Sequence, residues 1–510
     1  MPASTALPSA ATALRLGSRR SAAVAVLLAA VAVLLMGGLP PAASGASQTG
    51  APLSAVVALS GDQAVRAPGV DLVRMLPSVG VEIVRGSRAA LAGLAHVAGV
   101  LGVTPNLPVH LQAKAYAGAP IYAPQTLSIP PVADAGTGVN VAVIDTGVSD
   151  TATLERGTGR LVDGVDTSGL SNPNGTIQET GTFADGYGHG TYVASLIAGG
   201  SVSAGGGQIV GVAPGATVTV VKVADDHGRT SLASVVAGLD WVATHAQHDE
   251  IRVANLSLSV ARPSDAYGAD PLNIAVQRTR AQGVTVVVAA GNTAGVVSDP
   301  GFDPSALTVG AYDTTTDGVA SFSGSDPSIG KPDLVAAGVH VTGEVPADSI
   351  VGRSNKPVSR SDGEGNLLIP GTGTSGATAI VSGLAADFLS THPSATPDDV
   401  VASMRAAATS VSGSPGGLAQ LPTTVTQGTA PDYPDGWDAT KAGWPDEFWQ
   451  DDLWTQPWTA ATWNTRTWST RTWSTRTWST RTWSTRTWTT RTWTTRTWTE
   501  DMWSVSGWGS

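Results

Sequence analysis

Cysteine is absent from the 510-residue chain. The protein therefore has no disulfide, no thiolate metal site and no cysteine nucleophile. Charged residues make up only 14% of the sequence, against about 25% in average globular proteins, whereas glycine is abundant at 60 residues. This composition favours a tightly packed sheet protein with many loops. The net charge of −11 argues against a general affinity for nucleic acid.

Long apolar runs are also scarce, and the one that stands out lies near the N-terminus, at 22–36. Basic residues precede it and small residues follow it at 44–46, so we interpret residues 1–46 as a bacterial export signal. The run is shorter than the ~20 residues that cross a membrane, with an uncleaved anchor as the alternative. The pair Arg19-Arg20 also permits the twin-arginine route. We expect a secreted or envelope-associated protein.

Residues 51–113 form a small α/β unit in this interpretation. Short apolar runs predict strands, and an amphipathic stretch between them predicts a helix at 88–96. The expected strands are 56–59, 81–84 and 109–111. The unit stands directly before a larger domain of an exported protein, which favours a prosegment.

Residues 125–410 alternate apolar runs with amphipathic helices. The expected strands are 139–144, 217–223, 253–258, 284–289 and 307–311, and the expected helices are 191–199, 231–246, 271–282 and 375–390. Apolar strands joined by helical crossovers predict an α/β fold, a parallel sheet with helices on both faces. Active sites of such sheets gather at the carboxyl ends of the strands. Asp145 stands at such an end, straight after 139–144.

Three segments of this domain place reactive side chains beside glycines. Asp145 precedes Thr-Gly, His189 stands between two glycines, and Ser375 follows Gly-Thr-Gly-Thr at the start of a helix. Each residue alone has an ordinary structural explanation, as a turn cap, a helix-start histidine and an N-cap. Serine is a weak nucleophile unless a base takes its proton, and histidine is that base near neutral pH. A buried carboxylate orients the imidazole.

The three motifs, Asp-Thr-Gly, His-Gly-Thr and Gly-Thr-Ser, resemble those of the subtilisin-like serine proteases (subtilases), in the same order. The resemblance covers about 130–410, and 54–113 resembles the inhibitory prosegment of that family. It implies a subtilisin-like parallel sheet and an Asp145–His189–Ser375 triad that hydrolyses peptide bonds. It also implies that Asn292 and the N–H of Ser375 hold the oxyanion.

The same resemblance implies substrate contacts in two strand edges and one turn. The residues concerned are Gly228, Arg229, Thr230, Ser257, Leu258, Ser259 and Gly291. Ser259 replaces the usual glycine and Arg229 is bulkier than its usual counterpart, which indicates a narrower pocket or a preference for acidic flanking residues. The alternative for Arg229 is a solvated surface charge. Tyr192 replaces a frequent histidine.

Many subtilases bind calcium in a loop just after the histidine helix. Here that region, 199–208, holds no carboxylate and no asparagine. Calcium takes about six to eight oxygen ligands, preferably charged ones. We therefore expect no cofactor and no metal site that the sequence reveals, with calcium held by main-chain carbonyls as the alternative.

The C-terminal part differs in composition from the rest. Residues 411–440 are rich in Gly, Pro and Thr and predict a linker, and 441–510 form an acidic and then a Trp/Arg-repeat tail. Of the 16 tryptophans, only Trp241 precedes position 436. Trp favours interfaces and Arg favours phosphates, so the tail predicts attachment to a cell envelope. The alternative is a disordered, low-complexity extension.

The sequence thus predicts an exported serine endopeptidase that is made as a proenzyme, acts on protein or peptide substrates and is inhibited by its own prosegment. The alternative is an envelope-binding protein on an inert subtilase scaffold. That alternative is weaker because Asp145, His189, Ser375 and Asn292 are all intact.

Envelope attachment predicts that the secreted protein sediments with isolated cell envelopes at low salt, and that a chain ending at residue 440 does not. The expected release follows from loss of the tryptophan and arginine side chains of 441–510. Equal retention of the full and the shortened chain would count against a binding role for the tail.

Overall fold

The computed structural model describes residues 52–431, apart from 112–113, 116–120, 129–131, 173–174, 203–207, 261–269 and 364. The expected export signal (1–46) and the Trp/Arg tail (441–510) lie outside these residues. In the described part of the chain, no helix is both long enough and apolar enough to span a membrane.

The largest element is a nine-stranded sheet with the order β22-β18-β16-β15-β13-β7-β11-β8 and a short β17 beside β16. The pairs along this order are parallel. The strands are β7 (Asn140–Asp145), β8 (Leu161–Asp166), β11 (Thr217–Lys222), β13 (Ile251–Leu256), β15 (Thr285–Ala289), β16 (Leu307–Asp313), β17 (Gly318–Val319), β18 (Leu334–Ala337) and β22 (Gly417–Leu418). Valine-rich runs buried on both faces suit such a parallel sheet.

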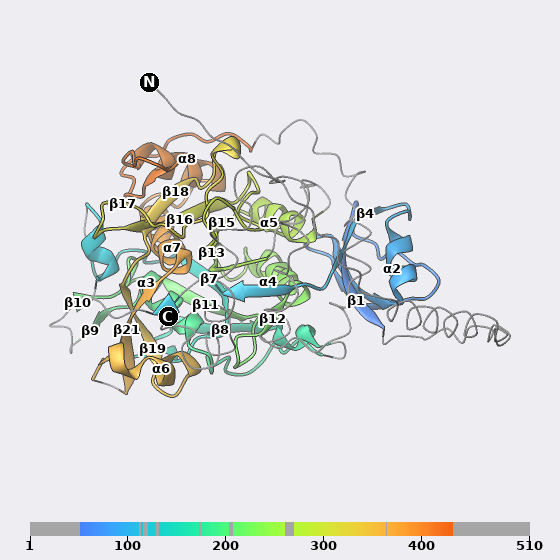
Figure 1. Ribbon diagram of the computed structural model, residues 1–510, viewed down its shortest axis with the longest axis horizontal. Coiled ribbons are helices and arrows are strands. Elements are labelled where there is room, and N and C mark those ends of the chain that lie inside the picture. The colour runs from blue at the N-terminus through green and yellow to red at the C-terminus, as the bar shows by residue number, and fades with distance from the viewer. Residues whose placement is uncertain are drawn as a thin grey trace, which may run out of the picture. The chain divides into compact units, whose positions relative to one another are not determined.

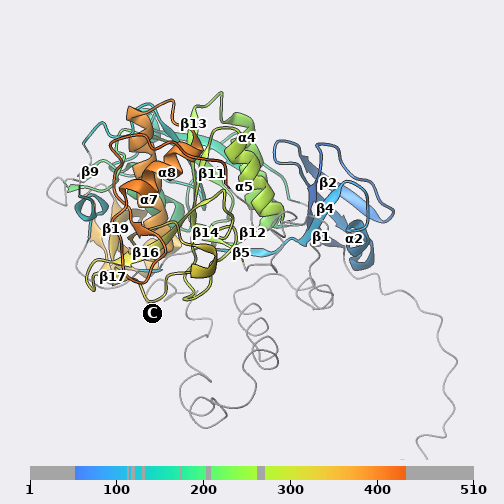
Figure 2. The same ribbon diagram turned by 90° about the horizontal axis from the view of Figure 1, so that it is seen from above.

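Helices cover both faces of this sheet. The helices α3 (His189–Ala198), α7 (Thr374–Thr391) and α8 (Pro397–Ala407) pack on one face, and α4 (Leu232–His245) and α5 (Pro271–Ala281) pack on the other, as Figures 1 and 2 show. In β7, Val141 and Val143 join the first core, while Ala142 and Ile144 join the second. This alternation follows from the two-residue period of a strand. The predicted α/β fold is confirmed.

The expected strands and helices of this domain are all present, but the sequence patterns missed others. They missed β8, which carries polar residues, as well as the short strands β18 and β22. They also missed α8, although Thr396, Pro397 and Asp399 form its capping box and first turn.

The prediction of a linker at 411–440 is wrong for residues 411–431. Strand β22 pairs with β18 at the edge of the large sheet, and Ala419 is buried in the core with 1% exposure. Further along, Thr426 N donates to Ser403 Oγ at 2.8 Å and Gly428 N donates to Asp399 Oδ1 at 2.9 Å. These contacts fasten the segment to α8, so it belongs to the large domain.

The N-terminal unit is a four-stranded antiparallel sheet with the order β2-β3-β1-β4 and one helix, α2 (Arg88–Leu94). Its strands are β1 (Leu53–Leu59), β2 (Val70–Leu76), β3 (Val81–Gly86) and β4 (Val100–Pro105). The sequence predicted β1, β3 and α2 but missed β2 and β4. The unit packs on α4, where Asp240 Oδ1 accepts from Ser78 N at 2.8 Å and from Val79 N at 3.2 Å.

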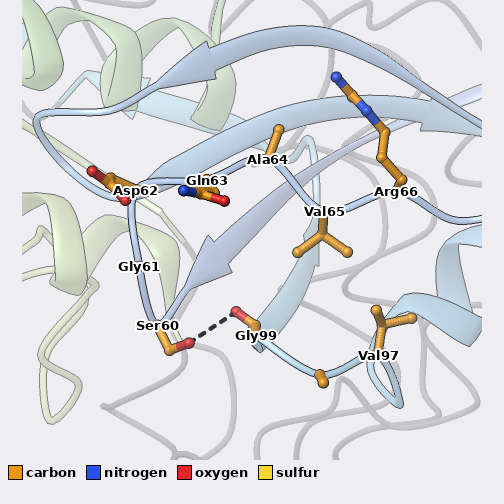
Figure 3. Close-up of a pocket in the computed structure, with 10 residues that line it drawn as sticks. Ser60, Gly61, Asp62, Gln63, Ala64, Val65, Arg66, Val97 and Gly99 are labelled. Atoms are coloured by element: carbon orange, nitrogen blue, oxygen red, sulfur yellow. Dashed lines mark hydrogen bonds between the residues drawn. The ribbon is translucent and has the colours of Figure 1, made fainter.

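A shallow depression on this N-terminal unit is lined by residues 60–66 and 97–99 (Figure 3). Ser60 Oγ donates across it to Gly99 O at 3.3 Å. None of its residues belongs to the three motifs singled out above.

Smaller elements complete the fold. They are β5 (Pro108–Leu111), β6 (Lys114–Ala115), β9 (Ser201–Val202), β10 (Gln208–Ile209), β12 (Thr230–Ser231), β14 (Leu258–Ser259), β19 (Val341–Pro346), β20 (Arg360–Ser361), β21 (Asn366–Thr372), α6 (Ile350–Ser354) and the 3-10 turns Ala123–Thr126, Arg156–Thr158, Ser168–Ser171, Pro327–Ile329 and Lys356–Val358. Strands β19, β21, β20 and β6 form one sheet, and β12, β5 and β14 form another.

Tyr192 of α3 lies against the sheet of β19 and β21. Its hydroxyl donates to Val341 O at 3.0 Å, and the residue is 1% exposed. A Cβ added at Gly343 would lie 2.6 Å from the ring, and one at Gly371 would also collide with it. The residue that departs from the family pattern thus fills a site formed by two glycines.

Asp333, Lys331 and Arg405 form an ion cluster before β18, in which Asp333 and Lys331 are buried. Asp333 accepts from Lys331 Nζ at 2.8 Å and from Thr308 N at 2.7 Å, and it pairs with Arg405 of α8. Burial alone would raise the pKa of Asp333, but Lys331 and Arg405 hold it below its usual value. The stabilisation is therefore present above the unfolded pKa and is lost as pH falls below it.

We expect Asp333→Asn to lower the free energy of unfolding by about 3–5 kcal/mol, because Lys331 then becomes a buried, uncompensated charge. Urea unfolding in a Ser375→Ala background measures this. The control is Asp225→Asn, which removes the more exposed pair with Arg229 and should cost about 1 kcal/mol or less. Equal losses in the two variants would contradict the assignment.

Candidate active site

The three motif residues lie at the ends of three different elements. Asp145 is the last residue of β7, His189 is the first residue of α3, and Ser375 is the second residue of α7. All three side chains are fully buried. The sheet thus brings together side chains that are up to 230 positions apart in the chain, counted as 375 minus 145.

Hydrogen bonds link the three side chains in one line. His189 Nδ1 lies 2.7 Å from Asp145 Oδ1 and 2.9 Å from Oδ2. His189 Nε2 lies 3.1 Å from Ser375 Oγ. A carboxylate accepts only, so it favours the proton on Nδ1 and leaves Nε2 to accept from the serine hydroxyl. The arrangement suits transfer of the serine proton to the imidazole.

Asp185 braces this pair, and the sequence analysis assigned it no role. Its Oδ1 accepts from Thr146 Oγ1 at 2.8 Å and from Gly188 N at 2.6 Å. Its Oδ2 accepts from the N–H and the hydroxyl of Thr191, both at 2.8 Å. Burial raises the pKa of Asp185, and these four donors oppose that effect. Asp185 therefore holds the backbone on both sides of His189 and the residue next to Asp145.

Lys222 is a second brace that the sequence analysis missed. It ends β11 directly beside Asp145. Its Nζ donates to Thr146 O at 2.8 Å, to Ala184 O at 2.8 Å and to Asp226 Oδ1 at 2.9 Å. The sequence signal for this role is a lysine at the end of an otherwise apolar strand, because a buried amine needs several hydrogen-bond acceptors.

Asn292 and Ser257 both contact the start of α7. Asn292 Oδ1 accepts from Thr374 N at 2.9 Å and from Thr374 Oγ1 at 3.0 Å, which leaves Nδ2 as the donor of this side chain. Ser257 Oγ donates to Ser375 O at 3.1 Å, and Ser257 O lies 3.1 Å from Ser375 Oγ, as a second acceptor beside His189 Nε2 for the single hydroxyl proton. Gly291 has φ 96° before Asn292, a conformation that favours glycine.

Strand β5 lies between the two strands that the sequence analysis assigned to substrate. It is antiparallel to both, with Val109 opposite Thr230, His110 opposite Ser259 and Leu111 opposite Leu258. Three residues after Leu111, Lys114 of β6 pairs with Thr372. The chain therefore pairs first with β12 and β14 and then with β21, three residues before Ser375 in sequence.

Gly228 and Arg229, which were also predicted to contact substrate, lie directly before β12. Gly228 has φ 73°, and a Cβ there would lie 2.8 Å from the ring of Tyr187. The side chain of Arg229 is 59% exposed, and its Nη2 lies 2.6 Å from Asp225 Oδ2. The guanidinium thus has an acidic partner within its own turn, and a preference for acidic substrates stays a prediction.

Within the ranges that the structure describes, no three His, Asp or Glu side chains gather closely enough to hold a metal ion. Residues 203–207 of the loop predicted to lack calcium ligands lie outside those ranges.

We expect the contact of β5 to depend on pH through His110. It is partly buried, its Nε2 is shielded from solvent, and burial lowers its pKa to about 4. The docked strand thus holds a neutral imidazole, whereas a released strand has the ordinary value near 6.5. Docking is therefore at full strength above about pH 6.5 and weakens as pH falls towards 4.

We expect hydrogen exchange of β5, corrected for its intrinsic pH dependence, to be faster at about pH 4.5 than at about pH 7.5 in the Ser375→Ala protein. A His110→Gln variant should lose most of this difference. The same acceleration in that variant would assign the effect to another group.

The sequence of the chain is similar to those of known proteins. The family model described as "Subtilase family" matches residues 136–437. Serine protease AprX of Bacillus subtilis (strain 168) is 34% identical over 281 residues, covering 52% of this chain and 60% of the relative. Subtilisin Savinase of Lederbergia lenta is 38% identical over 216 residues, covering 42% of this chain and 69% of the relative. The chain thus spans a little over half of AprX.

A solved structure shares the fold. Fervidolysin from Fervidobacterium pennivorans, titled a keratinolytic enzyme related to subtilisin, superposes with a TM-score of 0.56 at 24% identity and covers 73% of this chain and 60% of its own. This similarity concerns the fold alone. With the matched region spanning more than half of the sequence, the chain belongs to the subtilase family.

Proposed function

We propose that the protein is a secreted serine endopeptidase that is synthesised as a proenzyme. The observation that carries this proposal is the hydrogen-bonded line from Asp145 through His189 to Ser375. The expected export signal at 1–46 supports secretion. An inert scaffold for envelope binding is not favoured, because the nucleophile, base and carboxylate lie within hydrogen-bonding distance of one another.

In the proposed reaction, Ser375 Oγ attacks the carbonyl carbon of the substrate while His189 Nε2 takes the hydroxyl proton. Asp145 stabilises the imidazolium that forms. His189 then gives the proton to the amide nitrogen as the peptide bond breaks, and the amine leaves an acyl-enzyme on Ser375. Water attacks this ester in the same way, giving its proton to His189, and releases the carboxylic acid and the free serine.

The negative oxygen of the tetrahedral intermediate is held at the start of α7. Asn292 Nδ2 is the side-chain donor in this proposal, and the N–H of Ser375 is the backbone donor. The N-terminus of α7 supplies unpaired N–H groups and the positive end of a helix dipole, which stabilise an anion. The contact from Thr374 to Asn292 Oδ1 supports this role because it fixes the amide.

Peptide substrates would bind as β5 does, as the middle strand between β12 and β14. Pairing through the main chain holds an extended peptide with little dependence on its sequence. Thr230, Leu258 and Ser259 then provide the strand edges, and Ser257 lies against Ser375.

The N-terminal unit is the proposed intramolecular inhibitor. Strand β5, which follows the sheet of this unit, lies in the position proposed for substrate, and Ser375 is fully buried in the intact chain. Strand β5 ends at Leu111 beside β14, and β6 begins at Lys114 opposite Thr372, three residues before Ser375. These positions support a maturation cut within residues 111–114.

A serine-directed fluorophosphonate tests this function on the secreted protein, with intact mass and the N-terminal sequence of the product. We expect label on Ser375 and a mature chain that begins at residue 112, 113 or 114. Ser375→Ala should take no label and keep its N-terminal unit, whereas Ser390→Ala, in the same helix, should behave as the parent. Labelling or processing of Ser375→Ala would contradict the proposal.

A further inference from the structure

Arg160, directly before β8, gathers backbone carbonyls from three separate segments. Its Nη2 donates to Ala198 O at 2.6 Å and to Thr153 O at 3.2 Å, and its Nη1 donates to Pro214 O. Ala198 is the last residue of α3, Thr153 lies in the loop after β7, and Pro214 lies just before β11. The side chain is half-buried.

These three carbonyls form an electrostatic site for a cation. Oxygens that face one point carry like partial charges, and the end of α3 adds the negative end of its helix dipole. Backbone carbonyls are also ordinary ligands of calcium. A guanidinium meets the same need with a positive charge and several N–H donors in one plane. Burial lowers the pKa of Arg160, but an arginine remains charged in proteins.

The same junction carries the main-chain contacts that hold the end of α3. Gly200 N donates to Thr153 O at 3.3 Å, so this oxygen is shared with Arg160. Ala213 N donates to Ile197 O at 2.7 Å, one residue from Pro214. Arg160 therefore links the C-terminal end of α3 to both segments that border it, while the N-terminal end of α3 carries His189.

We propose that Arg160 is a built-in cation that takes the place of a calcium ion at the C-terminal end of α3. The resemblance to subtilases implies calcium just after this helix, yet the residues here do not fit it. The carbonyls are already bonded to a guanidinium, and 199–208 supplies no carboxylate. The fold of this region is thus independent of calcium, whether or not the chain is a peptidase.

The test is thermal unfolding of the full chain in a Ser375→Ala background, with EDTA and with millimolar calcium. We expect the Ser375→Ala protein that retains Arg160 to have the same Tm in EDTA and in calcium. Arg160→Met should lower Tm by at least about 3 °C, because three carbonyls lose their cation. The matched control is Arg252→Met, since Arg252 is also half-buried and donates to two carbonyls, Pro393 O and Ala395 O, both at 2.7 Å.

The Tm of an Arg160→Lys variant and the effect of calcium on the parent protein also test the proposal. Arg160→Lys retains the charge with fewer donors, so its Tm should fall between those of the parent and Arg160→Met, and it also serves if the methionine variant fails to fold. A parent protein that gains about 3 °C or more from calcium would overturn the proposal. So would an Arg160→Met protein no less stable than Arg252→Met.

Discussion

The hydrogen bond between the buried carboxylate of Asp145 and His189 is the constraint on which the rest of the site depends. A charge with no exposure is costly unless donors surround it. Asp145 Oδ1 accepts hydrogen bonds from His189 Nδ1 at 2.7 Å and from Thr146 N at 2.8 Å. The end of β7 must therefore meet the start of α3. Asp185 and Lys222 secure the same junction, so the loops around His189 are held by buried ionic groups.

Main-chain pairing explains how the N-terminal unit relates to the proposed cleft. Strands β12 and β14 each present an edge, and β5 satisfies both at once. An edge that accepts one extended strand can accept another, so the same geometry fits both the proposed inhibitor and the proposed peptide substrate. The contacts of Asp240 with the backbone of Ser78 and Val79 hold the N-terminal sheet on α4 independently of β5.

Two departures from the family pattern have a structural partner in this chain. Tyr192 requires the missing side chains of Gly343 and Gly371, so the three positions depend on one another. Arg229 is paired with the neighbouring carboxylate of Asp225. Asp145, His189 and Ser375 lie within hydrogen-bonding distance of one another in the chain that carries both departures.

The sequence by itself determined the parallel α/β fold and the identity of the three motif residues, because apolar periodicity and glycine-flanked motifs are local signals. It did not reveal that 411–431 joins the sheet through β22, since that segment has no apolar run and its pairing is decided by β18. The roles of Asp185, Lys222 and Arg160 also depended on tertiary structure. Their partners lie in distant segments, and a buried charge discloses its function only through the groups that the fold brings to it.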